Sequence, residues 1–165
     1  MRTSLPSPVR ARLSGIGATA ALLLSCGGLI GYGTELGTVD VRAGSPFFIE
    51  SEFVSEDAHR LWLEYDLDYF GFDYQVTGQI TVAAEERELL RIPIDFTTKK
   101  GPVPKAPKIS MYKRERIEDG RRCESATVLI SKLPIQPEGT PLTVTGTLTP
   151  ARDTRFRQVR LVLTD

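Results

Sequence analysis

Four side chains that could do chemistry alternate along one short stretch of the sequence. Within residues 60–69, Trp62, Glu64, Asp66 and Asp68 occupy every second position. In a β-strand this spacing puts them on one face, because successive side chains point to opposite sides. A tryptophan beside carboxylates can stack on a sugar ring and bind its hydroxyls, and grouped carboxylates can hold calcium. The spacing matches no known calcium loop, so we expect no metal, and a solvated strand face is the alternative to a binding one.

The same carboxylates could instead form an acid–base pair, together with Asp73 in the segment YFGFDY. A hydrolase of this kind needs one carboxyl group that is desolvated enough to stay protonated. His59 is the only histidine, and a lone surface histidine is expected to be structural, so a histidine-based triad is not indicated. We therefore expect a protein that is not an enzyme and that binds no cofactor.

A second candidate surface is the basic stretch at residues 99–122, which contains nine basic and three acidic residues. Its length and its three prolines predict an extended loop, in which the segment ISMYK could pair briefly as a strand. Such a loop could bind anionic headgroups, peptidoglycan or an acidic partner, or it could pair with the acidic stretch 50–73 of the same domain. Nucleic acid is not an expected partner, because aromatic residues are not interleaved with the cations. The basic candidates for binding are Lys99, Lys100, Lys113, Arg114 and Arg116.

The N-terminal residues have the features of a secretory signal peptide. Arg2, Arg10 and Arg12 precede a dozen uncharged residues, SGIGATAALLLS, and Cys26 follows directly. The apolar run is too short to cross a hydrocarbon core of about 30 Å. At its end, Leu23-Leu24-Ser25-Cys26 resembles the lipobox of bacterial lipoproteins.

The lipoprotein resemblance implies cleavage after Ser25, a diacylglycerol on the Cys26 thiol, and acylation of the new amino terminus. Acyl chains of this kind anchor a domain stably without a transmembrane helix. Gly27, rather than aspartate, follows the cysteine, and in enterobacterial-type sorting this implies the outer membrane. Two other interpretations stay open: residues 15–33 as an uncleaved anchor, or ordinary secretion with an incidental cysteine. All three place the domain outside the cytoplasm.

Charge and thiol content narrow the classes of function further. The 21 basic residues include three that precede the apolar run, so 18 remain against 21 acids, a net charge of −3. This balance disfavours a polyanion-binding protein. The second thiol, Cys123, has no partner if Cys26 is acylated, and we expect it to be buried as a small hydrophobe rather than to bridge two molecules.

From Thr38 onward, apolar and polar residues alternate in a way that is typical of half-buried strands. No segment of this region has helical periodicity, so the sequence predicts an all-β fold. We expect an antiparallel β-sandwich of seven to eight strands, immunoglobulin-like or fibronectin-like in general build. Pro93 should lie in an edge strand or at a bulge, because it cannot donate a ladder hydrogen bond. The expected strands are TVDVRA, PFFIESEF, RLWLEYDLDY, YQVTGQITV, ELLRIPIDF, ESATVLISKL, TPLTVTGTLT and RQVRLVLTD.

The expected organisation is a signal peptide at residues 1–25, a glycine-rich tether at 26–37 and the β-sandwich at 38–165. The expected function is that of a lipid-anchored envelope protein, a non-catalytic accessory or binding module that contacts an envelope protein or glycan. The alternatives are a carboxylate-based hydrolase and a structural subunit of a secretion or assembly complex. A concave apolar pocket around the carboxylates would favour the hydrolase, and an exposed strand edge or apolar patch would favour the subunit.

Overall fold

The computed structural model describes residues 33–99 and 110–165, and its regular structure there consists of nine β-strands. The signal segment with Cys26 lies outside the described residues, as does Lys100. No helix that is long and apolar enough to cross a membrane occurs in the described part of the chain. The strands are β1 (Glu35–Asp40), β2 (Pro46–Glu52), β3 (Arg60–Tyr69), β4 (Gln75–Ala84), β5 (Arg87–Thr97), β6 (Ser110–Glu118), β7 (Arg121–Lys132), β8 (Pro141–Pro150) and β9 (Thr154–Thr164).

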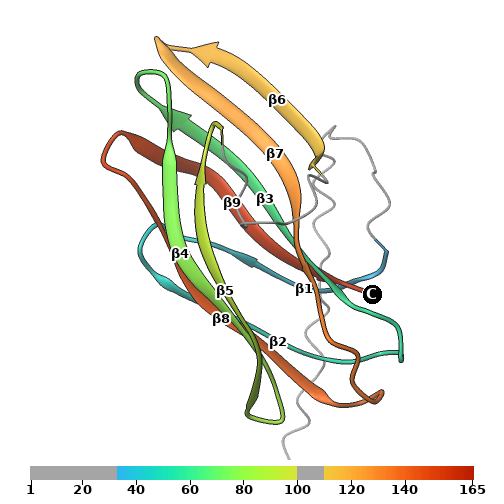
Figure 1. Ribbon diagram of the computed structural model, residues 1–165. Coiled ribbons are helices and arrows are strands. Elements are labelled where there is room, and N and C mark those ends of the chain that lie inside the picture. The colour runs from blue at the N-terminus through green and yellow to red at the C-terminus, as the bar shows by residue number, and fades with distance from the viewer. Residues whose placement is uncertain (1–32, 100–109) are drawn as a thin grey trace, which may run out of the picture.

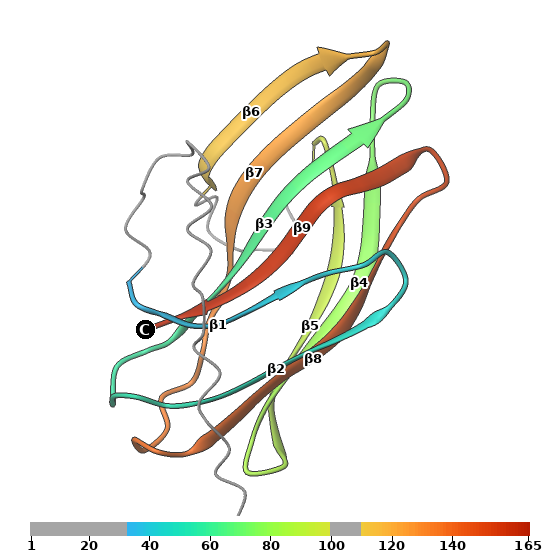
Figure 2. The same cartoon turned by 180° about the vertical axis from the view of Figure 1, so that it is seen from behind.

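The strands form two antiparallel sheets that pack face to face (Figures 1 and 2). One sheet has five strands in the order β1-β9-β3-β7-β6, and the other has four in the order β2-β8-β4-β5. This arrangement confirms the predicted antiparallel β-sandwich. Pro93 lies in β5, an edge strand with β4 as its partner, which confirms the expectation for this residue.

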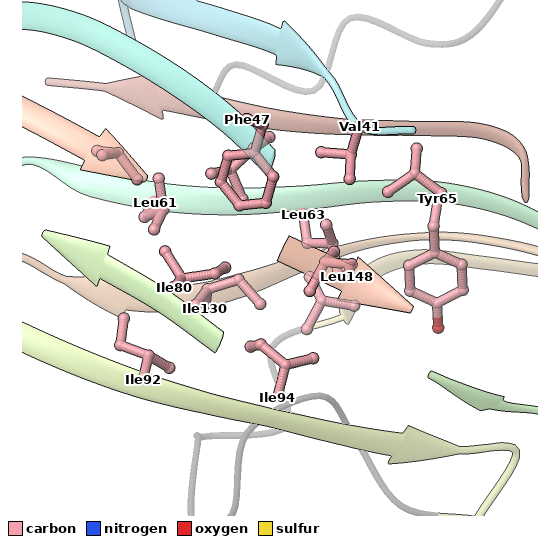
Figure 3. Close-up of a cluster of buried hydrophobic side chains, with 14 of the residues drawn as sticks. Val41, Phe47, Leu61, Leu63, Tyr65, Ile80, Ile92, Ile94, Ile130 and Leu148 are labelled. Carbon is pink, nitrogen blue, oxygen red and sulfur yellow. The ribbon is translucent and has the colours of Figure 1, made fainter. Parts of the chain in front are cut away.

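One continuous core fills the space between the sheets, and it follows the alternation of the sequence. In β3, Leu61, Leu63 and Leu67 are fully buried, because every second side chain of the strand faces the other sheet. Side chains from both sheets point toward one another across this layer, as Figure 3 shows for Leu63, Ile80 and others. Apolar side chains of β2, β4 and β5, and Tyr74 just before β4, are buried in the same way: Phe47, Ile49, Tyr74, Val76, Ile80, Val82, Ile92, Ile94 and Phe96.

The structure corrects the prediction at two places. The stretch expected to be a long loop, with brief pairing at ISMYK, contains a full ninth strand, β6, which forms a hairpin with β7. The turn between them is Asp119-Gly120, in which both residues have positive φ, as a two-residue type I′ turn requires. The second correction concerns the first strand, which was predicted as TVDVRA from Thr38: β1 spans Glu35–Asp40 and so begins three residues earlier.

The two termini of the described domain lie together at one end of the sandwich, which we call the near end. The Thr34 N–H donates to Asp165 Oδ1 at 2.5 Å, and the Asp165 N–H donates to the Thr34 carbonyl at 3.2 Å. Strand β3 runs from this end, where Arg60 pairs with Thr164, to the opposite end. The opposite end, which we call the far end, is formed by the β3–β4, β6–β7 and β8–β9 turns (Figure 1).

Candidate binding surface

The predicted alternation of Trp62 with three carboxylates places all four side chains on the outer face of the five-stranded sheet. Trp62 is only 5% exposed, because it packs against Leu129 and Val162 on that face. Its indole N–H donates to the Thr164 hydroxyl at 3.2 Å. A ring this buried offers little surface on which a sugar could stack, so Trp62 acts in this fold as a packing residue.

Arg116 connects the basic stretch to the acidic strand. Its guanidinium reaches from β6 across β7 and lies 2.8 Å from Asp66 on β3. The same guanidinium donates to the Ser125 hydroxyl of β7 at 2.7 Å. The small serine side chain leaves room for Arg116 to reach β3. Glu118 accepts a hydrogen bond from the same guanidinium at 2.5 Å. One arginine thereby holds three strands together.

The other two carboxylates of β3 also have arginine partners. Glu64 lies 3.4 Å from Arg160 on β9, and Asp68 lies 2.7 Å from Arg121 on β7. Two of the three arginines that pair with these carboxylates, Arg116 and Arg121, belong to the basic stretch. The basic stretch therefore pairs with the acidic strand of the same domain, which was one of the interpretations that the sequence left open. These side chains are half-buried but still reached by water, and such pairs contribute about 0–1 kcal/mol each, so their main effect is to fix the strand positions.

Asp73 has a separate role in the β3–β4 turn at the far end. It accepts hydrogen bonds from the Thr98 hydroxyl at 2.6 Å, the Thr98 N–H at 2.8 Å and the Tyr74 N–H at 2.9 Å. The Thr98 hydroxyl is the main reason why the pKa of Asp73 is lowered. A carboxyl group with a lowered pKa is ill suited to the protonated acid that the hydrolase hypothesis needs.

The remaining basic candidates do not converge on one site in the described structure. Lys99 is exposed at the end of β5, whereas Lys113 and Arg114 are exposed neighbours on β6. Lys113 lies on the core side of β6, where its ammonium is 3.2 Å from the carboxylate of Glu124. Consecutive residues of a strand point to opposite faces, so Arg114 lies on the outer face with Arg116.

Glu124 was not among the predicted residues, although it is the most buried carboxylate that the structure describes. Its side chain points into the core from β7 and is 1% exposed. One oxygen accepts hydrogen bonds from the hydroxyls of Tyr74 at 2.6 Å and Tyr65 at 3.0 Å. Burial raises the pKa of both tyrosines well above the ordinary value. The alternation of the segment ESATVLI contains the signal that could have identified it, because Glu124 is in phase with the buried alanine, valine and isoleucine.

His59 is buried, which corrects the expectation of a surface histidine and confirms that of a structural one. Its Nε2 accepts a hydrogen bond from the Val54 N–H at 3.3 Å, and its Nδ1 lies 3.0 Å from the Asp57 carbonyl, to which it donates. The ring also packs on Phe53, with the centroids 4.6 Å apart. Both nitrogens are used to hold the loop between β2 and β3.

Cys123 is buried, as the sequence predicted for a small hydrophobic residue. It lies at the start of β7, opposite Arg116 of β6. Arg157 approaches its sulfur to 3.4 Å from β9. The thiol is covered in the folded domain, and this position does not favour an intermolecular disulfide.

Exposed aromatic residues gather at the far end. Phe72 is 86% exposed and Phe70 is 55% exposed, on the turn that follows β3. The guanidinium carbon of Arg121 lies 3.8 Å from the Phe70 ring centroid, and that of Arg122 lies 5.4 Å from the Phe72 centroid. Ile117, opposite Arg122 in the ladder, is also exposed. We call these five residues the far-end patch. The sequence signal for it was the pair of aromatics that flank a glycine in YFGFDY.

The comparisons with known proteins assign no family to this chain. No three of the histidine, cysteine, aspartate and glutamate side chains that the structure describes lie where they could hold a metal ion together. No protein-family model matches the chain, and no curated protein matches it.

Proposed function

We propose that this protein is a bacterial lipoprotein of the cell envelope and that it acts as a non-catalytic binding module. In this proposal the acylated Cys26 anchors it in the outer membrane, and the β-sandwich contacts an envelope protein or glycan. The anchor rests on the lipobox-like residues Leu23-Leu24-Ser25-Cys26 and the arginines that precede them.

The observation that supports a binding role best is the position of the far-end patch. Thr34 at the near end is eight residues after Cys26, and eight extended residues reach at most about 30 Å. An anchored domain would therefore stay close to the bilayer and point its far end away from it. The patch at that end exposes two phenylalanines, which arginines hold in place by stacking. Aromatic residues and arginine are enriched among the residues that contribute most to protein interfaces.

Non-catalytic action is supported by the positions of the predicted carboxylates. Glu64, Asp66 and Asp68 each lie within ion-pair distance of an arginine, and they hold strands together on an open sheet face. The third class of function, a structural subunit of an assembly complex, shares the same far-end patch and differs from a binding module in the permanence of its contact.

Two variants test the binding role with the lipid-anchored protein. Phe72→Ala should abolish or strongly reduce recovery of a discrete partner from envelope extract, because hot-spot aromatics contribute on the order of 2 kcal/mol or more to an interface. The matched control is Phe48→Ala, which removes a phenylalanine that is 54% exposed on β2, away from the far end. Equal recovery with both variants would exclude the far-end patch as the binding surface.

The anchor is tested separately by the chemistry of the N-terminal peptide. Mass spectrometry of the mature protein should find a triacylated Cys26 at the amino terminus, and Cys26→Ser should release the protein from the membrane fraction. Cys123→Ala is the matched control, because it removes the other thiol and should leave the protein in the membrane fraction. A mature protein that retains residues 1–25 would contradict the lipoprotein assignment.

A further inference from the structure

Strand β9 changes its neighbours along its length. From Arg160 to Thr164 it lies between β1 and β3, but β1 turns away after Asp40. The last backbone hydrogen bond on that side joins the Val41 N–H to the Val159 carbonyl at 2.8 Å. Residues 154–158 pair with β3 alone among the strands that the structure describes. In Figure 2, β9 continues past the β1–β2 turn toward its hairpin with β8. This half of β9 therefore has an open edge of the kind that accepts a further strand.

A groove of about 640 Å³ runs along this open edge. Its floor is apolar, because Val41 and Val159 belong to the core and Phe156 packs partly against it. Phe156 reaches the floor through a register shift in the pairing of β9 with β3, which leaves Arg157 as the extra residue. The shift inverts the alternation, so that Thr154 and Phe156 face inward before it, and Val159, Leu161 and Leu163 face inward after it.

The charged residues at the rim of the groove are mainly arginines. Arg42 and Arg155 are exposed there and have no ion-pair partner among residues 33–99 and 110–165. The other two charges of the rim are already engaged: Arg157 is paired with Glu118, and Asp40 lies 3.9 Å from an arginine on β9. An anion placed along the groove would thus meet two available guanidinium groups.

We propose that this groove is a strand-addition site that takes an extended, acidic peptide segment of a partner protein. The open edge of five residues gives a track of roughly 17 Å, which accommodates a peptide of about five residues. Main-chain hydrogen bonds to β9 would supply affinity, and alternate side chains would lie on the apolar floor or toward the arginines. This inference deepens the proposed binding role and does not depend on the lipid anchor or on the far-end patch.

The charge of the groove disfavours the chain's own segments as its occupant. Residues 1–32 contain three arginines and no acid, and residues 100–109 contain three lysines and no acid. Either segment would bring like charge toward Arg42 and Arg155. An acidic strand from another protein has the complementary sign.

The test uses the full chain in detergent micelles and a seven-residue peptide of alternating glutamate and valine, observed by NMR of the backbone amides. We expect saturable binding, with shifts concentrated at residues 41–43 and 154–158. The double variant Arg42→Ala with Arg155→Ala should bind at least tenfold more weakly, and a lysine–valine peptide should not bind. A glutamate–valine peptide with a central proline should bind more weakly, because it lacks one ladder donor.

The matched control is Arg152→Ala, an exposed arginine in the adjacent turn that does not line the groove. It should retain the affinity of the wild type, and so should Phe72→Ala, which separates this site from the far-end patch. The proposal is overturned by absence of binding, by equal binding of the lysine peptide, or by equal losses in Arg152→Ala and the double variant. A dimer of the protein alone, with the amides of residues 154–158 protected, would also overturn it, because a second copy would then fill the groove.

Discussion

At the scale of single residues, Glu124 places a buried carboxylate in a core that is mainly apolar. A carboxylate removed from water is costly unless hydrogen bonds and an opposite charge replace the solvent. Tyr65 and Tyr74 supply the hydrogen bonds, and Lys113 supplies the charge from the edge strand β6. The cluster therefore couples the two sheets, because Tyr74 precedes β4 while the other three residues belong to the five-stranded sheet.

The Tyr74 hydroxyl can be removed without removing the ring. Tyr74→Phe should lower the free energy of unfolding by about 1–2 kcal/mol, because it deletes a hydrogen bond to a buried carboxylate. Tyr69→Phe is the matched control, since its hydroxyl has no hydrogen-bond partner among the described residues and its loss should cost less than about 0.5 kcal/mol. Urea unfolding of both variants measures the difference. Equal losses would mean that the hydrogen bond to Glu124 contributes nothing.

The raised pKa values of Tyr65 and Tyr74 predict a specific alkaline limit to stability. Their pKa is about 10 in the unfolded chain and higher in the fold, where burial opposes ionisation. The stability that comes from keeping them neutral is complete below about pH 10 and decreases as the pH rises above it. Thermal unfolding between pH 8 and pH 11.5 should show this decrease, and Tyr65→Phe with Tyr74→Phe should make it smaller; the pKa of Tyr69, also raised by burial, accounts for a remainder. A double variant with the wild-type slope would contradict the assignment.

At the scale of elements, the hairpin turns specify which strands pair. The β6–β7 turn uses Asp119-Gly120, whereas the β4–β5 turn places Glu85 and Glu86 at positive φ, where side chains with a Cβ are disfavoured. Both turns have positive φ at their two central residues. Asp-Gly is favoured in this conformation, whereas Glu-Glu is not. The β4–β5 turn is accordingly the place where the fold can be stabilised without a change in its core.

Replacing Glu85-Glu86 by Asn-Gly should raise the free energy of unfolding by about 1 kcal/mol, because it removes strain at two positions. Gly120→Ala in the other hairpin should lower it by about 1 kcal/mol, since alanine at φ 74° is strained. Open space surrounds Gly120, so a clash does not complicate the comparison. Denaturant midpoints of both variants show whether the free energy of unfolding rises or falls in each. A destabilised Asn-Gly variant would show that the glutamates have a role beyond the turn.

Most strands could be predicted because each sheet of the sandwich buries one face. Apolar and polar residues therefore alternate within each strand, and this pattern can be read from a few neighbouring residues. Of strand β6, only the part within the segment ISMYK could be predicted, because the rest of the strand is mostly charged and has little apolar alternation. The arginine partners of the acidic strand could not be predicted, because Asp66 and Arg116 are 50 residues apart and meet only through the order of the strands. The groove could not be predicted from the sequence either, because it depends on where the pairing of β1 with β9 ends.

At the scale of the whole molecule, the two ends of the sandwich differ in the residues that they expose, and we propose that they differ in function. The near end contains the chain termini of the described domain, and the far end contains the patch formed by Phe70, Phe72 and the stacked arginines. If Cys26 anchors the chain, these ends face the membrane and the surrounding envelope respectively. The central claim is that the far end contacts a partner in the cell.

The most direct test is site-specific photo-cross-linking in living cells of the native host. A photoreactive amino acid is placed at position 72 in one strain and at position 48 in another, and the protein is recovered after irradiation. The proposed function predicts a discrete cross-linked adduct from position 72 and none from position 48, because both phenylalanines are exposed but only Phe72 belongs to the far-end patch. Adducts of equal yield from both positions, or none from position 72, would contradict it.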